Sequence, residues 1–210
     1  MKGASLNMKN LNFRDVNWFA LVGGALTLVL AVTSLSVPWW QLTVGQTLAK
    51  IGFSPVNLSM DIMGYSVALP IITAINWMFM VLLVFAGTVL AVYSFMPLMP
   101  YSKRLLTFAY KKPLATLIGF LIILLLITNS GAIVGLIIGG SKTSGADLNV
   151  PWSGAKTLQL PSSISQGVVS GVYVSAEVGW TFWLAVTVAG LCIAARIYHR
   201  KLERSTSQLK

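Results

Sequence analysis

Four long apolar stretches divide the chain. They run approximately over residues 18–36, 71–96, 113–139 and 180–197, and none holds Lys, Arg, Asp or Glu before its last turn. A helix needs roughly 20 residues to cross about 30 Å of hydrocarbon. The pattern therefore predicts four membrane-spanning helices, packed as an all-α four-helix bundle in one integral membrane domain over residues 1–210.

The two long segments between these stretches, about 37–70 and 140–179, show a different period. In "GVVSGVYVSAEVGW" one side of the alternation holds Val172, Val174 and Ala176, and the other holds Tyr173, Ser175 and Glu177. "VNLSMDIM" and "WWQLTVGQ" alternate similarly, and a period of two is typical of a half-buried strand. Because a lone hairpin is marginal in water, we expect a small extracellular β-sheet cap of three strands drawn from both segments.

Prolines mark two further boundaries. Pro97 and Pro100 follow the second apolar stretch, and proline lacks the N–H that would continue a helix. Pro113 follows two lysines and suits the first turn of a helix. We therefore expect the second span to end near residue 96 and the third to begin at Pro113.

Charge gives the orientation. The chain is 56% hydrophobic and 10% charged, against about 25% in a soluble domain. The segments before the first span, between the second and third, and after the fourth, counted with Arg196 in the last turn of the fourth span, hold twelve basic and two acidic residues. The other two segments hold three of each. This positive-inside asymmetry predicts a multi-pass protein of the plasma membrane with both termini cytoplasmic. The net charge of +10 therefore reflects orientation in the lipid bilayer, which is the expected partner of the basic residues. Nucleic acid is excluded as a partner.

This arrangement resembles the claudin/PMP22-like four-transmembrane-helix family. The shared features are a basic N-terminus, four spans and a tryptophan-bearing first loop of β character, with Trp39-Trp40 in a place comparable to the family's Trp-Gly-Leu-Trp motif. The resemblance implies strands in both outer loops and a scaffold or adhesion role. The two cysteines that follow the family's motif are absent here.

Small residues predict helix contacts. Gly131, Gly135 and Gly139 are spaced four apart in the third span and let another helix approach closely. The first span carries a matching stripe of small side chains, namely Ala20, Gly24, Thr27, Ala31 and Ser34. We therefore expect the first and third spans to be neighbours, although the glycine face would equally suit a second subunit.

The outer segments hold the candidate partner surface. "LSVPWW" and "LNVPW" place Trp39, Trp40 and Trp152 on the same outer side, near the base or rim of the cap. We expect these tryptophans, with Tyr173 and Glu177, to contact partners. Glu177 could instead be a solvated junction residue or pair with a lysine of the cap. Asn57 opens an Asn-Leu-Ser acceptor sequon for N-glycosylation.

Catalytic chemistry is sparse in this sequence. The single histidine, His199, falls in the basic tail, where we expect it to be solvated, and the single cysteine, Cys192, allows no intrachain disulfide. We find no catalytic set, metal site or cofactor motif. The sequence therefore favours a non-enzymatic protein that acts by association with other membrane subunits or with itself, as a claudin-like scaffold or an accessory subunit.

Two other functions stay open. Polar side chains at membrane depth could line a small channel or transporter: Asn76, Thr128, Asn129 and Ser130. Alternatively, the chain could be an accessory subunit of a respiratory or quinone-linked membrane enzyme. The first apolar stretch also has a rival interpretation as a cleaved secretory signal, although its 19 or so residues exceed the 7–15 of a typical signal core.

Overall fold

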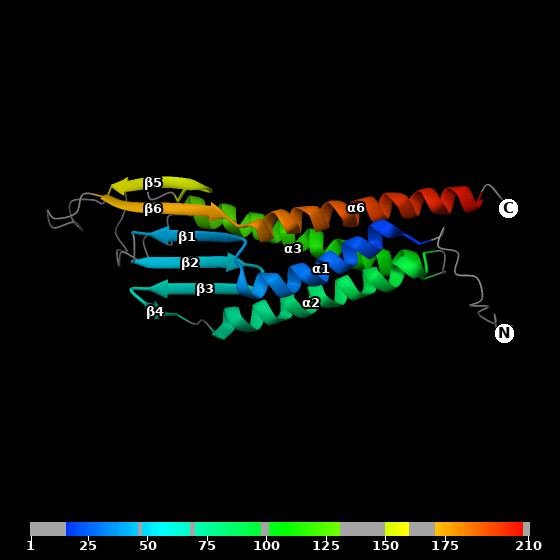
Figure 1. Ribbon diagram of the computed structural model, residues 1–210, viewed down its shortest axis with the longest axis horizontal. Coiled ribbons are helices and arrows are strands. Elements are labelled where there is room, and N and C mark those ends of the chain that lie inside the picture. Colours follow the sequence, from blue (N-terminus) through cyan, green and yellow to red (C-terminus); the bar gives the residue numbers. More distant parts are fainter. Residues whose placement is uncertain are drawn as a thin grey trace.

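The computed structural model describes residues 16–45, 48–67, 70–97, 101–130, 150–159 and 171–207. Its helices are α1 (Trp18–Ser36), α2 (Pro70–Phe95), α3 (Ser102–Ser130) and α6 (Trp180–Ser207). All four are long and apolar enough to cross a membrane, and they lie side by side as a bundle (Figure 1). The prediction of a bundle of four helices, each long and apolar enough to span a membrane, is confirmed.

The order of the helices around the bundle differs from expectation. Within the described residues, α1 packs against α2 and α6, and α3 packs against the same two helices. The first and third spans are therefore diagonal, and the prediction that they are neighbours is wrong there. The reason is that α2 also has a small-residue face, where Gly87 meets Gly24. The glycines at 131, 135 and 139 lie outside the described residues.

The third helix begins earlier than predicted. It starts at Ser102, whose hydroxyl donates to the Pro97 carbonyl at 2.7 Å, and Pro113 lies inside it. The prediction that Pro113 opens the helix is wrong. A proline within a membrane helix is tolerated because neighbouring helices and hydroxyl side chains satisfy the freed backbone groups. The second helix ends at Phe95, beside Pro97 as expected.

The described parts of the two long segments between the helices form one antiparallel sheet. Its strands are β1 (Trp40–Val44), β2 (Ala49–Ser54), β3 (Asn57–Ile62), β4 (Tyr65–Ser66), β5 (Gly154–Gln159) and β6 (Gly171–Val178), in the order β4-β3-β2-β1-β6-β5. The pairing of β1 with β6, which places Thr43 opposite Ser175, joins the two segments. The described sheet has six strands, more than the expected three.

The sheet extends from one end of the bundle, and the C-terminal end of α3 lies behind it (Figure 1). On β6, Val172, Val174 and Ala176 are buried and Tyr173 and Glu177 are exposed, which confirms the predicted alternation. The backbone of Val150 bonds to the Thr128 carbonyl, so the second segment is tied to α3 just before β5.

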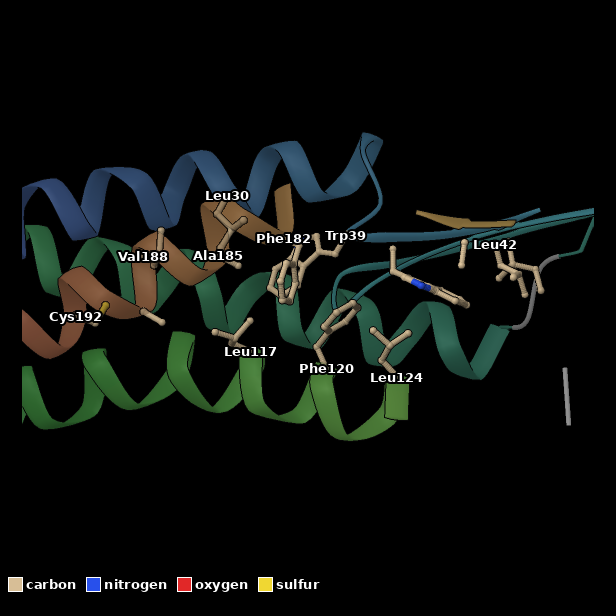
Figure 2. Close-up of a cluster of buried hydrophobic side chains, with 14 of the residues drawn as sticks. Leu30, Trp39, Leu42, Leu117, Phe120, Leu124, Phe182, Ala185, Val188 and Cys192 are labelled. Carbon is tan, nitrogen blue, oxygen red and sulfur yellow. The ribbon is translucent and has the colours of Figure 1, made fainter. Parts of the chain in front are cut away.

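Aromatic rings fill the joint between bundle and sheet. The ring of Phe120 on α3 lies 5.0 Å from that of Trp39, 5.1 Å from that of Phe53 and 6.0 Å from that of Phe182, measured between centroids. Figure 2 shows Phe120 pointing from α3 towards Trp39 and Phe182. One continuous core therefore connects the helices to the sheet.

Candidate functional site

Trp39 and Trp40 belong to this core. Each is only 1% exposed, so the prediction that they form part of the outer partner surface is wrong. The indole N–H of Trp39 donates to the Ser34 hydroxyl at 2.7 Å, and that of Trp40 donates to the Trp152 carbonyl at 2.9 Å. A buried indole needs such an acceptor, and here each bond joins two segments of the fold.

The other three predicted surface residues are exposed. Tyr173 and Glu177 lie on the polar face of β6, and Trp152 lies just before β5. Trp152 is 40% exposed and Tyr173 is 53% exposed. The bond between Trp40 and Trp152 also confirms that both Pro-Trp strings lie at the sheet-bearing end of the molecule.

A second exposed group lies at the far end of the strands. We call Leu48, Met63 and Tyr65 the tip patch; they are 40%, 66% and 79% exposed, respectively. The Met63 N–H donates to the Leu48 carbonyl at 2.8 Å, so the two hairpin ends are adjacent. Met63 has φ of 52° and Gly64 has φ of 84°. Two positive φ values in a two-residue turn are typical of type I′ hairpins.

Sequence reasoning missed the tip patch. The signal was the "IMGY" string, in which Gly64 follows an alternating strand and could have marked a hairpin turn. A methionine in the left-handed region is uncommon, because Cβ crowds the backbone there. The turn therefore displays a large apolar side chain where asparagine or glycine is usual.

Asn57 connects the sheet to the bundle. Its side-chain amide donates to the Leu35 carbonyl at the end of α1, at 2.7 Å. The amide nitrogen that would carry a glycan thus forms a hydrogen bond beside the helix end. Glycosylation of Asn57 stays a prediction.

Gly24 and Ala31 lie inside the bundle. A Cβ atom placed on Gly24 would lie 2.8 Å from the Gly87 carbonyl oxygen and 2.8 Å from the Ala91 nitrogen. Ala31 is fully buried and clusters with Leu83 and Val56. Both residues therefore face α2, so this part of the small-residue stripe is used within the chain.

A buried polar cluster ties three helices together at the end remote from the sheet. The amide of Asn17 donates to the Ala195 carbonyl at 3.0 Å and to the Tyr93 hydroxyl at 3.3 Å, and that hydroxyl lies 2.9 Å from Nδ1 of His199. His199 is 3% exposed. The expectation of a solvated histidine is wrong, because the ring is buried and packs against Tyr93 of α2. No local pattern could reveal partners so distant in sequence.

Two of the candidate channel residues, Thr128 and Asn129, form hydrogen bonds within α3. The Thr128 hydroxyl donates to the Leu124 carbonyl at 2.9 Å, and the Asn129 amide donates to the Leu125 carbonyl at 2.8 Å, so both bond within α3. Thr128 is buried and Asn129 is exposed. Asn76 on α2 is half-buried, and a path lined by these polar side chains stays a prediction. Within the described part of the chain, no group of three or more His, Cys, Asp or Glu could hold a metal ion.

Searches against family models, characterised proteins and solved structures find no match to this chain. The claudin/PMP22-like resemblance therefore stays an expectation about topology. The role of the protein has to be inferred from its own surfaces.

Proposed function

We propose that this protein is a non-enzymatic membrane subunit that acts by association, with the sheet as its contact surface. The observation that carries the proposal is the tip patch, where Met63 and Tyr65 are 66% and 79% exposed at the end of the sheet away from the helices (Figure 1). Exposed apolar groups of this kind mark protein interaction sites.

The location of the tip patch separates it from the other exposed apolar side chains. Ile71, Val81 and Leu126, for example, are exposed on helices long enough to span a membrane, and lipid covers such faces. The tip patch is on a turn of the sheet, beyond the reach of the lipid around the helices. The composition of the tip patch fits a protein partner, since aromatic and methionine side chains are enriched at protein–protein interfaces.

Charge supports an outward-facing sheet. Eight described basic residues lie on the halves of α3 and α6 remote from the sheet: Lys103, Arg104, Lys111, Lys112, Arg196, Arg200, Lys201 and Arg204. The described sheet carries two charges of each sign, from Lys50, Lys156, Asp61 and Glu177. Under the positive-inside rule the basic end is cytoplasmic. This protein would then contact its partner on the outer side of the membrane. It would do so either as an accessory subunit of a larger complex or as a claudin-like scaffold.

A charge placed in the tip patch tests the proposal. Membranes that express the protein are solubilised in mild detergent, and its apparent size is compared among the wild type, Tyr65→Glu and Thr157→Glu. Thr157 is an exposed residue of β5 and serves as the matched control. We expect a wild-type complex larger than the monomer, its loss with Tyr65→Glu and its retention with Thr157→Glu. A monomeric wild type, or equal effects of the two variants, would contradict the proposal.

A further inference from the structure

An arginine and a tyrosine meet where α3 and α6 pack together, at the end of the bundle remote from the sheet. The guanidinium carbon of Arg196 lies 4.4 Å from the ring centroid of Tyr110. Both side chains are half-buried. Stacking on an aromatic face attracts a cation and fixes the plane of the guanidinium. The donor fork of Arg196 is thus held in place before any ligand arrives.

The positive charge at this point is not neutralised by described carboxylates. Neither Arg196 nor Arg200 forms an ion pair with an acidic side chain in the described ranges. Arg200 lies one helical turn from Arg196, so the two share a face of α6, and Arg200 is exposed. Arg196 and Arg200 therefore place two cationic donors beside the junction of α3 and α6, with no acidic partner among the described side chains.

The depth of this junction is fixed by the neighbouring polar cluster. Asn17, which caps α1, donates to the carbonyl of Ala195, the residue before Arg196. The apolar run of α1 begins at the next residue, Trp18. Arg196 therefore lies level with the start of a membrane span, at the boundary between hydrocarbon and headgroups, where arginine side chains extend to the polar layer.

We propose that Arg196, Arg200 and Tyr110 form a binding site for the phosphate of an anionic phospholipid. Arginine binds phosphate through two parallel hydrogen bonds, and a tyrosine hydroxyl offers a further donor. Ile193 and Ile197 are 43% and 63% exposed on the adjoining part of α6, and acyl chains of the same lipid would cover them. Hydrogen-bond donors for a phosphate thus lie beside an exposed apolar surface. This combination favours an amphiphilic ligand over a free anion.

The headgroup should be anionic. A choline headgroup carries its own cation, which Arg196 and Arg200 would repel, whereas a glycerol headgroup does not. Basic pockets between membrane helices are known to bind acidic lipid headgroups in this way. The site requires only that the helices span a membrane, so it does not depend on the proposed role of the tip patch.

Lipid retention by native mass spectrometry tests the site. The purified full-length protein in detergent is titrated with phosphatidylglycerol, and in parallel with phosphatidylcholine and with inorganic phosphate. Arg196→Ala is compared with Lys201→Ala, which removes the same charge from an exposed position on the same helix. We expect affinity for phosphatidylglycerol to fall about tenfold with Arg196→Ala and less than about twofold with Lys201→Ala.

Three results would overturn the proposal. Equal losses in the two variants would show that the lipid responds only to general surface charge. Equal affinity for phosphatidylcholine would exclude an anionic site, and displacement of the lipid by millimolar inorganic phosphate would indicate a free-anion site. If Arg196→Ala lowers the melting temperature, Arg200→Ala replaces it, because Arg200 is exposed; it must then lose more lipid than Lys201→Ala for the proposal to stand.

Discussion

At the scale of single residues, the partner of a side chain decides its role. Tryptophans at a predicted membrane edge are typical of an aromatic belt, yet Trp39 and Trp40 are core residues here. Their N–H acceptors are the hydroxyl of Ser34, five residues before Trp39, and the carbonyl of Trp152, which is 112 residues from Trp40 in sequence. The first acceptor could have been anticipated from the sequence, whereas the second depends on how the two outer segments pair.

The contact between Gly24 and Gly87 makes a residue-scale prediction. In Gly24→Ala the new methyl group would meet backbone atoms of α2 at 2.8 Å, and backbone cannot move aside cheaply. Overpacking of this kind costs about 1–3 kcal/mol. Gly190 on α6 has no atom within 4 Å of such a methyl group, so Gly190→Ala should be neutral or gain up to about 1 kcal/mol from helix propensity.

Thermal unfolding in one detergent, followed by circular dichroism, compares these two alanine variants directly. We expect Gly24→Ala to melt below the wild type and Gly190→Ala to melt at or above it. A Gly24→Ala protein as stable as Gly190→Ala would mean that α1 and α2 do not approach so closely.

At the scale of elements, the alternation of apolar and polar residues predicted the strands that have one apolar face. It did not predict the others. β6 and β3 alternate clearly, and β1 was recognised from "WWQLTVGQ". β2 was missed because its burial does not alternate: Ile51 and Gly52, which lie on opposite faces, are both buried. A Cβ on Gly52 would lie 2.6 Å from the Ser59 hydroxyl. β5 was missed because it is an edge strand with Lys156 opposite the buried Val174. Edge strands are commonly polar.

The pairing of β1 with β6 gives a prediction at this scale. Thr43 and Ser175 are direct cross-strand partners, and such pairs have Cβ atoms about 4.5–5.5 Å apart. A Thr43→Cys/Ser175→Cys protein should therefore form a disulfide under mild oxidation. Ala155 is opposite Ser175 on the next strand, so it lies two strands from Thr43, about 10 Å away. Thr43→Cys/Ala155→Cys should not cross-link, because a disulfide needs Cα atoms within about 7 Å.

Mobility on a denaturing gel with and without reductant detects the cross-link. The native cysteine, Cys192, is buried in α6 and adds little background. Cross-linking of the control pair alone would refute the strand order β1-β6-β5.

At the scale of the whole molecule, two ends of different character are joined by one core. The sheet end carries balanced charge and the tip patch, and the opposite end carries the basic residues and the buried Asn17–Tyr93–His199 cluster. The described chain begins and finishes at the basic end (Figure 1). The spans and their charge asymmetry were readable from sequence, since both are properties of composition. The tip patch could not be predicted from sequence in the same way, because it depends on which hairpin ends lie side by side in the folded sheet.

This polarity predicts which sites reagents reach from outside the cell. Tyr173 is exposed on the sheet, and Lys201 is exposed on α6 near the opposite end. Under the positive-inside rule, Tyr173→Cys should react with a membrane-impermeant maleimide in intact cells. Lys201→Cys should react only after the membrane is opened. Buried Cys192 makes the unsubstituted protein the background control. Labelling of Lys201→Cys alone in intact cells would show the opposite orientation, with the tip patch on the cytoplasmic side.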